Sequence, residues 1–158
     1  MIRSVLAAAA ISLAAQPALA LSCIVPDVAR STQAAMDSSE TYRIVVGKFE
    51  FDTLSPPFDG TTLGDGEAAS IPAQFNGYAL TSDGFTDPTR DKVILNVTCM
   101  MQSCGGIGSG VETLAFLRSD GADPILELGP CPQWAFPTPT DAQKQTVLDC
   151  VTGDCPTD

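Results

Sequence analysis

The most distinctive chemistry in this sequence belongs to its six cysteines. Two pairs, Cys99 with Cys104 and Cys150 with Cys155, share the spacing C-x4-C. Zinc sites and thioredoxin-type redox pairs favour the shorter C-x2-C spacing, so we expect neither a metal site nor a cofactor. An even number of cysteines in an exported chain predicts a disulfide framework instead. The cysteines are Cys23, Cys99, Cys104, Cys131, Cys150 and Cys155.

Histidine is absent from the chain. Its absence removes the commonest general base and the usual activator of a serine or cysteine nucleophile. Carboxylates are the remaining acid–base groups, and Asp59, Asp65 and Glu67 lie close together in the sequence. They lack the ligand spacing of an EF-hand, but a close pair of carboxylates could support a hydrolase. We expect a protein that is not an enzyme and assign no catalytic residue, and we keep the carboxylate-based hydrolase as an alternative.

Residues 1–20 have the pattern of a secretory signal peptide. Arg3 precedes an apolar run, and Ala18 and Ala20 supply the small residues of a cleavage site. The run is shorter than the ~20 apolar residues that span a membrane. We therefore expect cleavage after Ala20 and an exported protein, periplasmic or secreted, without a transmembrane segment. Cleavage after Ser22 is the alternative and would make Cys23 the first residue, where a lipoprotein signal would also place a cysteine.

The charge of the chain narrows the choice of partners. There are 19 acidic and 8 basic residues, for a net charge of -11. Such a surface repels phosphate backbones and anionic lipids. We therefore expect a protein or a small extracellular ligand as partner rather than nucleic acid, whereas the oligomeric state is left open.

The patterning of residues 21–158 predicts a single domain with a short helix, five strands and a C-terminal helix. Asp27 is a plausible N-cap for the first helix, Thr140 or Asp141 is one for the last helix, and Gly153 is expected to end that helix. Five short strands favour a mainly β fold: a small, disulfide-stabilised, five-stranded Greek-key barrel of the OB type with one helix at each end. The expected strands are residues 41–51, 71–81, 92–100, 111–118 and 125–129, and the last helix is about 140–152.

Three details of this pattern concern local geometry. The apolar residues change face at Gly47, which predicts a bulge or sharp bend in the first strand. Asn76 and Gly77 predict either a bulge or a tight turn. The Pro-rich segment 132–139 carries Trp134 and Phe136, which are candidates for an exposed apolar binding patch, although such residues more often cap a core.

Several short motifs resemble netrin-like domains, a group that includes the tissue inhibitors of metalloproteinases. The resemblance covers most of residues 23–131 and implies an OB-type barrel. The motifs are Cys23-Ile24-Val25-Pro26, Ile44-Val45-Val46-Gly47-Lys48-Phe49, Cys104-Gly105, Leu114-Ala115-Phe116-Leu117 and Leu126-Glu127-Leu128-Gly129-Pro130-Cys131.

The resemblance implies that Cys23 pairs with Cys131 or Cys104. A local Cys99–Cys104 bridge would leave Cys23–Cys131, and Cys150–Cys155 could close a small loop at the end of the last helix. In the inhibitors, the amine and carbonyl of the first cysteine chelate the protease zinc, which here requires cleavage after Ser22. The chain differs from that family at Val25, where the inhibitors carry a second cysteine.

The resemblance also implies a binding surface, which we call the N-terminal ridge. From these observations we expect an exported, non-enzymatic binding or interaction module. The first alternative is a metalloprotease inhibitor that acts through the N-terminal ridge, and the second is the carboxylate-based hydrolase. The ridge consists of Cys23, Ile24, Val25, Met100, Met101, Gln102 and Ser103.

Overall fold

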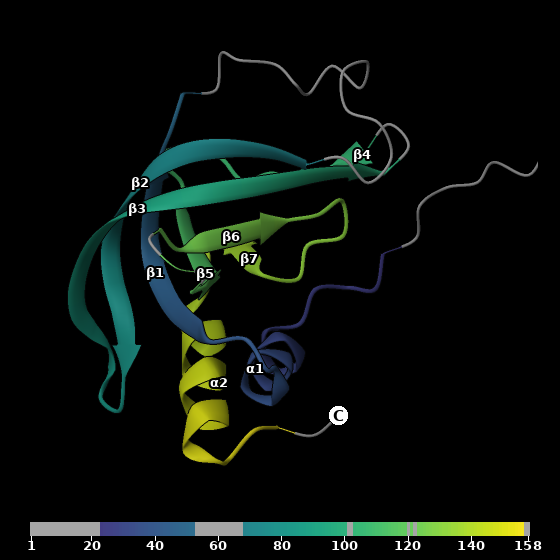
Figure 1. Cartoon of the computed structure of the whole chain (residues 1–158). Coiled ribbons are helices and arrows are strands. Elements are labelled where there is room, and N and C mark those ends of the chain that lie inside the picture. The colour runs from purple at the N-terminus through teal and green to yellow at the C-terminus, as the bar shows by residue number, and fades with distance from the viewer. Residues whose placement is uncertain (1–22, 53–67, 101–102, 120, 122, 157–158) are drawn as a thin grey trace, which may run out of the picture.

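The computed structural model describes residues 23–52, 68–100, 103–119, 121 and 123–156. Within these residues the fold is mainly β, with a seven-stranded sheet and two helices (Figure 1). The elements in chain order are α1 (Val28–Asp37), β1 (Tyr42–Glu50), β2 (Ala68–Thr81), β3 (Gly84–Met100), β4 (Ser103–Cys104), β5 (Glu112–Arg118), β6 (Ile125–Leu128), β7 (Ala135–Pro137) and α2 (Asp141–Thr152).

The strand order is β1-β2-β3-β6-β5-β7, and β1 also pairs with β5. The β1–β2, β2–β3 and β1–β5 pairs are antiparallel, whereas β3 and β6 run parallel. The second side of β3 pairs with β6 from Ile94 onward; within the described chain, the stretch from Gly84 to Val93 pairs only with β2. The β2–β3 hairpin is therefore a long two-stranded arm, which bends toward α2 at its far end (Figure 1).

The sheet is larger than the five strands expected from the sequence. The short strands β4 and β7 were not expected, because β4 has two residues and β7 lies in the Pro-rich segment. The strand β3 begins at Gly84 rather than at residue 92. Partners on β2 continue as far as Thr81, so pairing overrides the turn-forming residues between 84 and 91.

Alternate residues of β1 supply two separate cores. Val45 and Phe49 belong to the larger core inside the sheet, whereas Ile44 and Val46 pack under the helices. This is the change of face that the sequence predicts, since successive side chains of a strand point to opposite sides. Other members of the larger core include Phe75, Val93, Leu95, Leu117 and Leu126, and members of the smaller core include Val28, Leu114, Phe116 and Val147.

The bulge expected at Gly47 is absent from the described register, and Asn76-Gly77 forms neither a bulge nor a turn. Gly47 pairs directly with Gly77 in a continuous register, and the shift falls between Ala79 and Leu80 instead. A Cβ on Gly77 would lie 2.2 Å from the carbonyl oxygen of Val46. These two glycines are therefore required for the close approach of β1 and β2.

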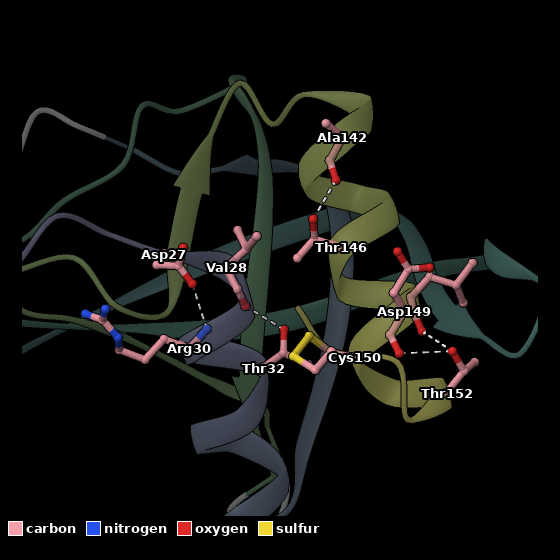
Figure 2. Close-up of a disulfide and its surroundings, with 11 residues drawn as sticks. Asp27, Val28, Arg30, Thr32, Ala142, Thr146, Asp149, Cys150 and Thr152 are labelled. Atoms are coloured by element: carbon pink, nitrogen blue, oxygen red, sulfur yellow. Dashed lines mark hydrogen bonds between the residues drawn. A yellow bond between two sulfur atoms is a disulfide. The ribbon is translucent and has the colours of Figure 1, made fainter. Parts of the chain in front are cut away.

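Both helices begin with the caps that their sequences predict. The side chain of Asp27 accepts a hydrogen bond of 2.8 Å from the amide of Arg30 (Figure 2). At α2, Thr140 and Gln143 form a reciprocal capping box, and Gly153 ends the helix with φ 101°. These contacts satisfy amides and carbonyls that have no partner within the helix.

Three disulfides stabilise the fold: Cys23–Cys131, Cys99–Cys104 and Cys150–Cys155. The first closes a sequence separation of 108 residues, and the other two each close 5. Cys150 lies buried on α2 beside α1 (Figure 2). In the described part of the chain, no helix is both long and apolar enough to cross a membrane.

Candidate functional site

The first part of the N-terminal ridge is an extended segment that is fixed at both ends. The disulfide to Cys131 holds Cys23, and the N-cap Asp27 begins α1 four residues later. Between these anchors, the exposed fractions of Ile24 and Val25 are 75% and 80%. Two branched apolar side chains are therefore presented to solvent on a backbone that is anchored on either side.

A hollow of about 430 Å³ lies beside this segment. Its other wall is the segment after Cys131, and Ser31 joins the two walls because its hydroxyl donates a 2.6 Å hydrogen bond to the carbonyl of Gln133. Arg30 lines the hollow and supplies a cation. The hollow is large enough to hold a side chain or a short peptide segment.

The second part of the ridge surrounds the short β3–β4 pairing. Met100 is 47% exposed and Ser103 is also exposed, whereas Met101 and Gln102 lie outside the described residues. The amide of Gly105 donates a 3.0 Å hydrogen bond to the carbonyl of Thr98, and Gly105 lies against the end of β6 at Leu128. The chain continues from β6 to Cys131, so both parts of the ridge are tied to the same end of β6.

Phe136 is buried and Trp134 is half-buried, so these residues cap the cores, the alternative stated above, and do not form the exposed apolar patch. Phe136 is 5% exposed and lies in the smaller core. Trp134 is half-buried between the two cores and stacks on Tyr42 with a centroid distance of 4.7 Å. The pairing of β7 with β5 turns both aromatic residues inward, a pairing that local sequence does not reveal.

An apolar cavity of about 220 Å³ lies near the start of β2. It was not predicted from the sequence. Asp52 supplies the ionisable group in its lining, and the remaining residues are apolar or glycine. Alternating apolar residues were predicted for the surrounding strands, but which of them border open space depends on tertiary packing. The apolar lining residues are Phe51, Ile71, Leu95, Val97, Ile107 and Leu128.

The described residues contain no cluster of three or more His, Cys, Asp or Glu side chains that could hold a metal ion. Every described cysteine is in a disulfide, which leaves no free thiol among these residues. Asp59, Asp65 and Glu67, the carboxylates of the hydrolase alternative, lie outside the described residues, as do residues 1–20, the expected signal segment.

The strongest electrostatic perturbation in the described chain lies at Tyr42. Burial raises the pKa of its phenol above the usual value near 10, and Arg118 partly opposes this by favouring the ionised form. Glu127 and Glu40 also raise the pKa. The ring of Tyr42 also stacks on Trp134.

No family model, curated protein or solved structure matches this chain. The described residues form a mainly β fold with two helices and three disulfides.

Proposed function

We propose that this protein is an exported, non-enzymatic binding module that contacts a protein partner through the N-terminal ridge. One observation carries the proposal: Ile24 and Val25 are largely exposed although the disulfide at Cys23 and the cap at Asp27 fix the segment that bears them. An apolar pair held in place contributes buried area on binding and loses little conformational entropy. The adjacent hollow could accept a side chain from the partner.

We further propose that the sheet is a netrin-like, OB-type Greek-key barrel. The strand pairings support this, because the series β1-β2-β3-β6-β5 returns to β1 through the β1–β5 pair. The β5–β6 contact that completes the series consists of one residue pair, Arg118 with Ile125. A barrel of this kind would place the ridge at one rim, where OB-type proteins carry their binding loops.

Export is part of the same proposal. Residues 1–20 would act as the signal peptide, with cleavage after Ala20 or after Ser22. Three disulfides are consistent with an oxidising compartment outside the cytoplasm. The intact mass of the exported protein would identify its first residue and would detect a lipid on Cys23.

Inhibition of a metalloprotease is the second candidate function. The Cys23–Cys131 bridge favours it, since it fixes residue 23 beside two exposed apolar residues. Zinc chelation would require a free amine on Cys23, because a peptide nitrogen has no available lone pair. The mature protein should be assayed against an extracellular zinc metalloprotease with a fluorogenic peptide. A chain that begins at Leu21 and does not inhibit would eliminate this candidate.

A photo-crosslinking amino acid at Val25 tests the ridge directly in cells that export the protein. The matched control carries the same amino acid at Gln33, an exposed position on α1. We expect a discrete protein adduct from position 25 that the Ile24→Asp substitution reduces. Equal labelling from both positions, or none from position 25, would show that the ridge is not a binding surface.

A further inference from the structure

A second cleft lies away from the N-terminal ridge, between α2 and the arm formed by β2 and β3. It has a volume of about 420 Å³, and we call it the hairpin cleft. The far end of the arm bends toward α2 (Figure 1), and Leu80 and Phe85 pack against the smaller core there. The cleft is lined by Val46, Lys48, Tyr78, Phe85, Glu112 and Lys144, together with Asn76 and two glycines.

The strand register places its side chains in two neighbouring rows. One row of direct cross-strand neighbours consists of Glu112, Lys48, Asn76 and Arg90, and the next row contains Val46 and Tyr78. Directly paired residues point to the same face of a sheet. A polar row with two cations and one carboxylate therefore lies beside a row with an aromatic ring that is 49% exposed.

Basic residues are few in a chain with a net charge of -11. Lys48 and Arg90, like Arg30 and Lys92, form no ion pair within the described part of the chain. Lys144 is held by Glu112, with 3.0 Å between Nζ and Oε1. Lys48 and Arg90 thus remain available to an external anion.

The strand pairing beneath the cleft argues against an extended peptide as the ligand. At Asn76 and Tyr78, β2 is paired with β1 on one side and β3 on the other. Strand addition, the usual way to bind an extended peptide, needs an unpaired strand edge. Recognition here would depend on side chains: a ring for an apolar face, an amide for hydroxyl groups and cations for a carboxylate.

We propose that the hairpin cleft binds a short oligosaccharide built from uronic acids. A pyranose ring has an apolar face for Tyr78 and hydroxyl groups for Asn76, and its carboxylate would lie near Lys48. One carboxylate per sugar suits a cleft with few cations, whereas the negative charge of the whole protein repels a more densely charged polymer. This inference does not depend on the ridge or on its partner.

Calorimetry with the full exported protein tests the proposal. The probes are trigalacturonate, trimannuronate and methyl-esterified trigalacturonate, which keeps the rings but loses the charge. We expect at least one of the two acidic probes to bind and the ester to bind more weakly. Tyr78→Ala should weaken binding about tenfold, and Lys48→Gln about fivefold at low salt. Tyr78→Phe should retain most of the affinity, which separates ring stacking from misfolding.

Two matched controls keep the result specific. Arg30→Gln removes another cation without an ion pair in the described chain, but at the ridge; it should leave saccharide binding unchanged. Ile24→Asp should also leave it unchanged, so that failure of the ridge proposal stays separate from failure of this one. Binding of neither acidic probe, equal binding of the ester, or preference for a hexaglutamate peptide would each overturn the assignment.

Discussion

Removal of the Cys23–Cys131 disulfide should destabilise the protein more than removal of either short-range disulfide. The loop-entropy relation gives about 4.8 kcal/mol for the long loop and about 2.2 kcal/mol for a loop the size of that closed by Cys150–Cys155. The difference arises in the unfolded chain, because the long bridge restricts a separation of 108 residues and the short one restricts 5.

The comparison uses two double variants, Cys23→Ala with Cys131→Ala and Cys150→Ala with Cys155→Ala. Cys150 is buried, so its truncation adds a packing cost and narrows the expected gap to about 1–2 kcal/mol. Urea unfolding can be followed through Trp134, the only tryptophan, which lies between the two cores. The variant without the long bridge should also have the larger denaturant slope, because its unfolded state expands more.

Equal free energies of unfolding for the two double variants would refute this reasoning. Such a result would mean that the unfolded chain already keeps its N-terminus near residue 131, or that the native segment gains as much freedom as the unfolded chain. The single variant Asp27→Ala shows the effect of loosening the native segment alone, because it removes the cap of α1 and leaves the disulfide intact. Its cost should be about 1 kcal/mol.

Three further predictions concern the cores and the helices. Gly77→Ala should destabilise the protein by about 1–3 kcal/mol, because its Cβ would meet backbone at 2.2 Å; Gly106→Ala, where a Cβ meets nothing within 4 Å, is the control in urea unfolding. Thr140→Ala should cost about 1 kcal/mol through loss of the capping box, measured by thermal unfolding. The raised pKa of Tyr42 stabilises the fold fully below pH 10, and this contribution is lost as the pH rises through the folded value. Tyr42→Phe should therefore flatten the fall in the urea midpoint above pH 10; an unchanged slope would contradict the role of burial.

Periodicity in the sequence was sufficient for the main strands and for both helices. The change of face in β1 is visible as alternating apolar residues, and both caps follow from Asp27 and Thr140. Local signals failed where pairing decides the outcome. Residues 84–91 contain Asp87-Pro88, a turn signal, yet they are strand because β2 supplies partners opposite them. The bulge expected at Gly47 is absent, and the close approach of Gly47 to Gly77 could not be predicted because it depends on a residue 30 positions away in the chain.

The same contrast between local sequence signals and tertiary contacts applies to the candidate sites. Cys23, Ile24 and Val25 stand out by type and position, but their exposure depends on where Cys131 lies in the fold. Trp134 was ambiguous because a large aromatic residue in a loop can cap a core or face solvent, and only its stacking on Tyr42 decides. The hairpin cleft could not be predicted from the sequence, because its residues come from four strands and α2.

The stretch of β3 from Gly84 to Val93, which pairs only with β2 in the described part of the chain, affects the tendency of the protein to aggregate. A long strand with one unpaired side is a template on which another chain can add. Here that stretch carries Asp87 and Pro88. The proline removes an amide donor, and the Asp87 carboxylate repels the same edge of another copy. The arm can therefore extend well beyond the rest of the sheet without seeding aggregation.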